Sequence, residues 1–218
     1  VNSDTHGQLV DETYRYDGEH LTAYDRTKWQ AHWEEAVPRI QDGLPLTIVM
    51  PGVVYGPGDT SALAQLWRDH LQGKLPAIPR RTAYCWGHVE DIARAHVQAL
   101  ERGKPQETYI IAGEKHALTR IMELAAEITG RDAPRTLPPW VFQAMAGVSS
   151  LINRVTDLPE GYDPETLRVM AGTTYLGDNA KAVTELGLEH RPIEEGLRET
   201  LAWEAEQLGI QLPTTAPV

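Results

Sequence analysis

The chain has 218 residues, 41% of them hydrophobic, which is enough to form the core of one large domain or two small ones. Its formal net charge of -11 argues against nucleic acid or an anionic membrane surface as a partner, because both would repel an acidic protein. The single cysteine, Cys85, excludes an internal disulfide, and no apolar run approaches the length that spans a bilayer. These features indicate a cytoplasmic protein.

A polar loop over residues 1–21 leads to a helix predicted from residue 24 to about residue 40, which Asp42-Gly43-Leu44-Pro45 ends. This helix carries Tyr24 and Lys28, which share a face because residues four apart on a helix are neighbours. A fixed positive charge at Lys28 would favour the phenolate form of Tyr24, so the pair predicts proton exchange with an alcohol or carbonyl. By spacing alone, a half-buried tyrosine beside a solvated lysine is the alternative.

A short apolar run over residues 46–50 follows, and Pro51 and a Gly/Pro cluster that reaches Asp59 end it. The run predicts a strand of a parallel sheet that is apolar on both faces, with sheet neighbours on either side. Ligands of open α/β sheets lie outside the carboxyl ends of the strands. The loop over residues 51–59 is therefore where a cofactor is expected, although an ordinary turn is the alternative.

Further along the chain we predict helices over residues 61–71, 89–102 and 119–129, the last stopped by Gly130, an extended segment over 80–86 and a strand over 107–112. From residue 133 to 172 prolines interrupt the apolar stretches, as in a variable lobe that closes over substrate. The helix over 89–102 is expected to bury an apolar face, made of Val89, Ile92, Ala93, His96 and Leu100.

Several polar residues were weighed as candidates for a site. His88 and Asp91 could form an acid–base pair, but Glu90 and Asp91 also suit the positive end of a helix dipole, which favours a structural role. His96 is expected to be a hydrogen-bonded core histidine. The eight histidines show no spacing typical of a metal site, so we expect no metal.

In this order, the segments resemble the extended branch of the short-chain dehydrogenase/reductase superfamily, and within it the dihydroflavonol-reductase-like group of NAD(P)-dependent reductases and epimerases. The resemblance rests on the Tyr24 and Lys28 pair, the loop over 51–59, the stretches over 88–91 and 109–113, and two C-terminal stretches over 178–187 and 193–203. It implies an α/β fold: the carboxyl-terminal portion of a Rossmann-type doubly wound parallel sheet with a smaller, mostly helical substrate lobe.

The resemblance also implies a division of the chain into domains. Residues 1–60 and 80–115 would form the C-terminal part of a Rossmann dinucleotide-binding domain, and residues 61–79 and 116–218 the substrate-binding lobe. Hydride would pass between NAD or NADP and a small-molecule secondary alcohol or ketone, with Tyr24 as the general acid or base.

Other residues would hold the cofactor. Lys28 would also bind the nicotinamide ribose hydroxyls, and a stretch of backbone would contact the nicotinamide carboxamide, namely Pro51, Gly52, Val53 and Val54. Trp29 and Trp33 are read first as core residues, but the resemblance implies a homodimer formed through their helix. A non-catalytic dinucleotide sensor or scaffold of the same fold is the alternative function, and the presence of Tyr24 beside Lys28 favours the enzyme.

The sequence departs from the family at its front end. None of the eighteen glycines falls into the Gly-x-x-Gly-x-x-Gly turn that cradles a pyrophosphate. Ser3 stands in a polar loop, whereas the family's catalytic serine sits on a strand. We therefore expect the chain to be the carboxyl-terminal part of a longer enzyme, with little dinucleotide affinity of its own. A fold rebuilt without a nucleotide half is the alternative.

Overall fold

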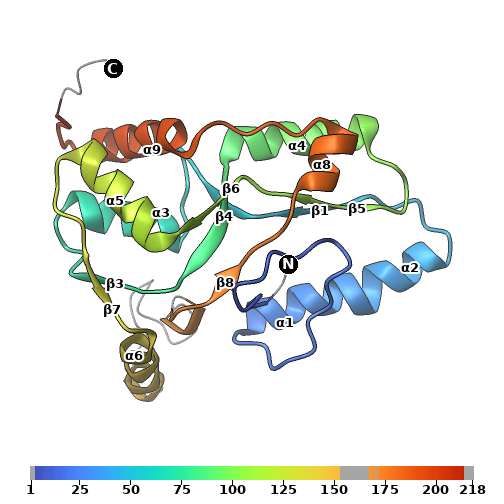
Figure 1. Ribbon diagram of the computed structural model, residues 1–218, viewed down its shortest axis with the longest axis horizontal. Coiled ribbons are helices and arrows are strands. Elements are labelled where there is room, and N and C mark those ends of the chain that lie inside the picture. The colour runs from blue at the N-terminus through green and yellow to red at the C-terminus, as the bar shows by residue number, and fades with distance from the viewer. Residues whose placement is uncertain (1–2, 153–166, 170, 214–218) are drawn as a thin grey trace. The chain divides into compact units, whose positions relative to one another are not determined.

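The computed structural model describes residues 3–152, 167–169 and 171–213 (Figure 1). The chain forms two compact units that interleave along the sequence. Unit 1 consists of Val1–Val54, Ala83–Lys115 and Thr173–Arg191, and unit 2 of Tyr55–Thr82, His116–Gly172 and Pro192–Val218. Residues 173–191 lie in the same compact unit as the N-terminal segment.

The first helical segment of unit 1 contains three consecutive parts: α1 (Ala23–Gln30), the π-helix η1 (Ala31–Ala36) and α2 (Val37–Gln41). Thr22 caps α1, because its side chain accepts a hydrogen bond from the N–H of Asp25 at 3.0 Å. In η1 the N–H of Val37 bonds to the carbonyl of His32, five residues back, next to Pro38, which has no N–H to donate. The predicted helix over 24–40 is confirmed, with a π-helical middle.

Two parallel strands, β1 (Ile48–Pro51) and β5 (Thr108–Ile111), pair with Ile48 opposite Thr108. Among the described residues β1 pairs only with β5, so one of the two sheet neighbours expected for this strand is present. The outer edge of β5 is closed by side chains instead of a strand. Glu12 accepts from the N–H of Ile110 at 2.9 Å, and two further side chains donate to carbonyl groups on the same edge, Lys181 to Thr108 and Asn179 to Ala112.

A second sheet has the order β2-β4-β6, formed by β2 (Val53–Tyr55), β4 (Ala83–His88) and β6 (Glu114–Ala117). The boundary between the two units falls within β2 and within β6. The two-residue strand β8 (Thr174–Tyr175) pairs with β4 in parallel, with Tyr84 opposite Tyr175. The extended segment predicted over 80–86 is observed as β4, whereas β6 and β8 were not predicted.

Helix α4 (Val89–Arg102) has the predicted bounds, but its predicted buried face is wrong. The buried residues are Asp91, Ile92, Ala95 and Ala99, while the side chain of Leu100 is 87% exposed. Small alanines face the sheet and α8 (Ala180–Leu186), because only short side chains let the helix approach closely. This core cluster contains Ile92, Ala95, Ala99, Tyr109, Ile111, Ala182, Leu186 and Leu188. We expected His96 to be a hydrogen-bonded core histidine. Its ring does donate a hydrogen bond to the carbonyl of Ile92 at 2.8 Å, but His96 is exposed and is not part of the core.

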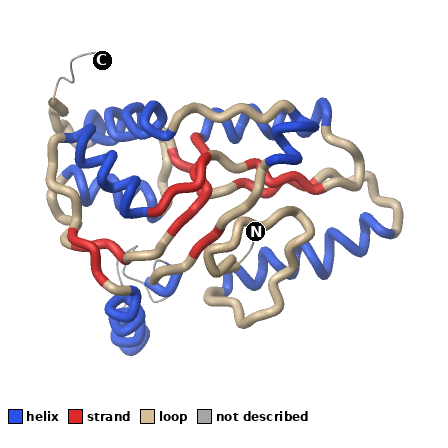
Figure 2. The backbone as a smooth tube through the Cα atoms, viewed as in Figure 1, coloured by secondary structure: helices blue, strands red, loops and turns tan. Residues whose placement is uncertain are grey.

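Unit 2 is mostly helical (Figure 2). Its helices α3 (Ala62–Leu71) and α5 (Leu118–Thr129) both pack against α9 (Ile193–Gln207). Both predicted helices, over 61–71 and 119–129, are confirmed. Arg68 of α3 binds the fully buried carboxylate of Glu204 of α9 at 2.8 Å, so that a charge in this core is paired.

The remaining part of unit 2 contains a short parallel pair, β3 (Ala77–Pro79) and β7 (Arg135–Leu137), and the helix α6 (Pro139–Ile152). We predicted only prolines interrupting apolar stretches between residues 133 and 172. Pro139 stands at the first position of α6, where its missing N–H costs nothing and its fixed φ suits a helix. The rest of that prediction, over 153–166, lies outside the described residues.

Candidate active site

Helix α1 has an inner and an outer face, and the predicted catalytic residues lie on the outer one. Asp25, Trp29 and His32 follow one another at intervals of four and three residues and face the interior of unit 1. Tyr24, whose side chain is 67% exposed, and Lys28 face outward. The ammonium of Lys28 lies 5.5 Å from the centroid of the Tyr24 ring. The structure therefore brings the two residues together, as their spacing predicted.

A buried hydrogen bond fixes the inner face of the same helix. The Tyr175 hydroxyl of β8 donates to the carboxylate of Asp25 at 3.0 Å. Burial and the neighbouring Asp25 carboxylate both raise the pKa of Tyr175, so that this phenol stays protonated and continues to donate. Neither residue of this pair was among those predicted from the sequence. The spacing of Asp25 with Trp29 and His32 marks an inward-facing carboxylate, but nothing local points to Tyr175, 150 residues away.

The segment predicted to bind the nicotinamide carboxamide consists of two strand ends joined by Gly52. Pro51 ends β1 and is exposed, while Val53 and Val54 begin β2 and are half-buried. The N–H of Gly52 donates to the carbonyl of Ile111 at 3.2 Å, so the sheet already uses this donor. A Cβ at position 52 would meet the carbonyl oxygen of Cys85, which explains why glycine stands there.

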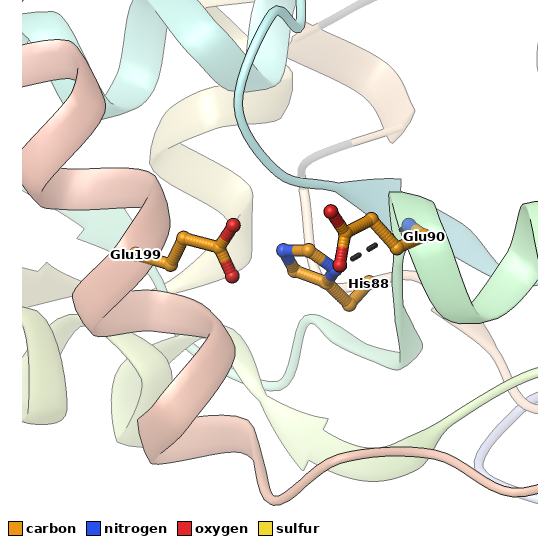
Figure 3. A group of neighbouring side chains, drawn as sticks. All are labelled: His88, Glu90 and Glu199. Carbon is orange, nitrogen blue, oxygen red and sulfur yellow. Dashed lines mark hydrogen bonds between the residues drawn. The ribbon is translucent and has the colours of Figure 1, made fainter.

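His88 and Asp91 have separate partners. His88 is buried and caps α4, its Nδ1 accepting from the N–H of Glu90 at 3.4 Å (Figure 3). Asp91 binds Arg191 through the backbone N–H at 2.9 Å and through the guanidinium at 3.1 Å. Burial alone would raise the pKa of Asp91, but the hydrogen bonds and the charge of Arg191 outweigh it and lower this pKa. These contacts are those of structural residues, as the helix-dipole argument predicted.

A pocket opens on the inner side of α1, and neither Tyr24 nor Lys28 lines it. The guanidinium of Arg15 lies over the indole rings of Trp29 and Trp33, at 5.2 and 5.5 Å from their centroids. Burial lowers the pKa of His32 beside them, which keeps that imidazole neutral at pH 7. The lining combines acidic and aromatic side chains: Asp11, Glu12, Tyr14, Tyr16, Trp29, His32, Trp33 and Met50.

The parallel strand pairs and the flanking helices define an α/β protein, and Tyr24 and Lys28 share one helix face, as the resemblance to the short-chain dehydrogenase/reductase superfamily implies. The NAD dependent epimerase/dehydratase family matches residues 3–112, half of the chain. The chain belongs to this family, within the extended branch of that superfamily.

Individual relatives agree with this assignment. A Synechocystis protein named for dihydroflavonol 4-reductase is 30% identical over 90% of this chain. The crystal structure of gox2253 matches 97% of this chain at 28% identity with a TM-score of 0.77. That of a nucleoside-diphosphate-sugar epimerase from Pseudomonas aeruginosa matches 96% at 25% identity with a TM-score of 0.74. This chain spans 59% of the Synechocystis protein and 64% of each of the two crystallised chains.

The length and composition of the helices also bear on membranes. Within the described ranges, none of the helices is both long enough and apolar enough to cross a bilayer.

Proposed function

We propose that this chain carries the proton-transfer residues of an NAD(P)-dependent oxidoreductase or epimerase that acts on a secondary alcohol or ketone. The observation that carries the proposal is the pairing of Tyr24 with Lys28 on the exposed face of α1, in a chain of the NAD-dependent epimerase/dehydratase family. Relatives named as a reductase, a decarboxylating dehydrogenase and an epimerase support the same reaction class.

Tyr24 would donate a proton to the carbonyl oxygen in reduction and accept one from the alcohol in oxidation. Its hydroxyl is suited to this task because the ring is largely exposed and carried by a capped helix. The bond from Tyr175 to Asp25 would act as a positioning contact, since it holds the opposite face of α1 against β8. A well-held proton donor needs less reorganisation when the reaction occurs.

The donors available on this face fit a nicotinamide ribose. An ammonium with three donors at Lys28 and a hydroxyl at Tyr24 stand side by side, the chemistry that binds vicinal hydroxyl groups. We assign Lys28 to the ribose hydroxyls and the backbone from Pro51 to Val54 to the carboxamide. The cofactor, when bound, supplies or takes up a hydride. Whether it is NAD or NADP is the finer choice, and the family description favours NAD.

The two compact units are suited to two separate binding functions. We assign dinucleotide binding to unit 1, which contains α1, β1 and β5, and substrate binding to the mostly helical unit 2. The substrate would be a small molecule, in a cytoplasmic homodimer that needs neither a metal nor nucleic acid. A non-catalytic dinucleotide sensor of the same fold is the second candidate.

The proposal is tested with the protein expressed from its whole gene. NADH and NADPH absorbance is followed in the presence of a panel of ketones and sugar nucleotides. We expect Tyr24→Phe to lower kcat by about two to four orders of magnitude, because it removes the proton donor and little else. NADH fluorescence titration should show unchanged cofactor affinity in this variant. Undiminished turnover in Tyr24→Phe would refute the role of the phenol.

Two further results separate the alternatives. Lys28→Ala should weaken NADH binding several-fold, and unchanged affinity would remove Lys28 from the cofactor site. A wild-type protein that binds NADH but turns over none of the panel, with Tyr24→Phe binding equally well, would favour the sensor. Arg26→Ala, on the same helix and also exposed, is the matched control and should change neither measurement.

A further inference from the structure

Helix α6 of unit 2 is mostly apolar, with Gln143, Ser149 and Ser150 as its polar residues. None of its fourteen residues, Pro139–Ile152, carries a charge. One side of the helix is buried, where Phe142 and Ala146 pack against Leu167 and Ala171. This packing satisfies one face of the helix and leaves the other to be explained.

The opposite face of α6 meets solvent with large apolar side chains. Trp140 is 66% exposed and Val148 58%, and Met145 beside them is also exposed. A helix face that carries several large apolar side chains is normally covered, either by protein or by lipid. A contiguous apolar face of this kind marks a surface that another phase or molecule covers.

Basic side chains stand where α6 begins. The strand β7 ends at Leu137, two residues before the helix, and its neighbour β3 leads into Arg80 and Arg81 (Figure 1). The N–H of Arg80 donates to the carbonyl of Leu137 at 2.9 Å. Arg81 and Arg135 are exposed as well, and the Arg80 guanidinium donates to Thr136 of β7, so these cations stand on and next to the two strands, of which β7 leads into α6.

Acidic residues are absent from both stretches that build this region. Residues 70–89 and 133–152 contain no Asp or Glu, although the whole chain has 31 acidic and 20 basic residues. Exposed charges act over about one Debye length, roughly 8 Å at physiological salt. Among the described residues, the charged side chains on β7 and directly after β3 are therefore basic, whatever the net charge of -11 implies for the molecule as a whole.

We propose that α6 and the adjoining arginines, Arg80, Arg81 and Arg135, form a site that binds the surface of an anionic lipid bilayer. The helix would lie in the plane of the interface with Trp140 and Val148 at the acyl boundary and the arginines among the headgroups. Tryptophan suits that depth because its ring is apolar with one polar edge. Fourteen residues are fewer than the ~20 that span a bilayer, so the contact is peripheral.

The arginines favour lipid over a second copy of this chain. A two-fold pairing with the α6 helices parallel would bring the same cations of both copies toward one another, which opposes association, whereas an anionic surface attracts them. The site is independent of the proposed hydride transfer. The net charge led us to expect no anionic membrane as a partner. The proposed site is an exception, because that expectation used only the charge of the whole molecule.

Binding is tested by co-sedimentation of the chain with vesicles of phosphatidylcholine alone and of phosphatidylcholine containing about one third phosphatidylglycerol. We expect binding to the anionic vesicles only, weakening as salt is raised. Arg81→Gln and Arg135→Gln each remove one positive charge. Each variant should lower the coefficient for partition into the anionic vesicles about fivefold. Val148→Glu should reduce it about tenfold or more, because it places a carboxylate at the acyl boundary.

The matched control is Leu100→Glu, which introduces the same charge at an exposed leucine of α4 in unit 1 and should bind as the wild type does. Circular dichroism and thermal unfolding establish that each variant is folded. No binding to anionic vesicles by the wild type, or equal losses in Leu100→Glu and Val148→Glu, would overturn the proposal. So would a wild-type dimer in solution that Val148→Glu converts to monomer, since a second copy would then cover α6.

Discussion

Asp91 and Glu90 are adjacent carboxylates that bind the same arginine from different environments. Asp91 is buried, and Glu90 is exposed and 2.6 Å from the guanidinium of Arg191. A buried charge that loses its partner leaves an uncompensated ion in the interior, whereas an exposed one is replaced by water. The two positions therefore separate the value of a buried ion pair from that of a surface pair.

We expect Asp91→Ala to lower the free energy of unfolding by about 3 kcal/mol, because it leaves the Arg191 guanidinium, itself largely buried, without its inner partner. Glu90→Gln is the control and should change stability little. Urea unfolding followed by circular dichroism measures both. Equal losses in the two variants would contradict the structural role assigned to Asp91.

His70 gives unit 2 a dependence on pH. The Thr129 hydroxyl donates to the carbonyl of Ala125 at 2.7 Å, so its oxygen accepts from Nε2–H of His70 at 3.0 Å. Burial lowers the pKa of His70 below its usual value, against a smaller opposing effect of the Ala125 carbonyl. The folded state thus binds fewer protons than the unfolded state as the pH falls past the unfolded pKa of about 6.5.

The stabilisation linked to this neutral ring is complete above the unfolded pKa and is lost as the pH falls below it. We therefore expect the free energy of unfolding to decrease between pH 7.5 and pH 5, and His70→Gln to weaken that decrease. His96→Gln, at an exposed position, is the control for the exchange of a histidine for a glutamine. A His70→Gln profile that overlays the wild type would show that His70 is not the responsible group. Burial lowers the pKa of His32 as well, so part of the dependence should remain.

At the scale of elements, two glycines, one at the end of a helix and one inside a helix, test what the missing side chain contributes. Gly130 follows α5 with φ of +68°, in the left-handed region, and a Cβ there would lie 2.9 Å from Pro213. Gly147 is inside α6, and a Cβ there would have nothing within 4 Å. The same substitution should therefore have opposite effects at the two positions.

We expect Gly130→Ala to destabilise the protein by about 1 kcal/mol or more, since it forces a side chain into the left-handed conformation. Gly147→Ala should stabilise it by about 0.5–1 kcal/mol, because alanine loses less backbone entropy in a helix. Thermal unfolding of the two variants against the wild type compares them. If both variants were destabilised, the loss in Gly130→Ala could not be attributed to the left-handed conformation that ends α5.

The elements that could be predicted are those whose first and last residues are determined by the nearby sequence. The bounds of α4 follow from its periodic pattern, and the end of α5 from Gly130. The buried face of α4 was predicted wrongly because hydrophobicity favoured Val89 and Leu100, whereas close packing selected Ala95 and Ala99. The strand β8 was missed because two residues carry too little pattern.

The candidate site divides in the same way. Tyr24 and Lys28 were predictable because four residues along one helix determine their proximity. The bonds from Tyr175 to Asp25 and from Arg191 to Asp91 join residues 150 and 100 apart, and only the tertiary fold brings them together. A periodic pattern reports which face a residue occupies, and it carries no information on the partner across the core.

For the molecule as a whole, assembly is the property that α1 and η1 bear on. Trp29 and Trp33 are half-buried, with Arg15 over both rings. We expect a homodimer through this helical segment, because a half-buried tryptophan such as Trp33, beside an arginine, is typical of interface centres.

Trp33→Glu should convert this dimer to monomer in sedimentation velocity, while Trp140→Glu, the same change in unit 2, should leave the dimer intact. A wild-type protein that sediments as a monomer would contradict the expectation. A dimer that only Trp140→Glu dissociates would place the interface on α6 instead.

The interleaving of the two units has a consequence for inheritance. The chain passes from one unit to the other after residues 54, 82, 115, 172 and 191, so neither unit is encoded by one uninterrupted stretch of gene. A single recombination event between related genes inside that range would join parts of both units from two parents, and it could not exchange one of them whole. In any such recombinant both units are therefore assembled from two parents, so substitutions on either side of the crossover must be compatible within each unit.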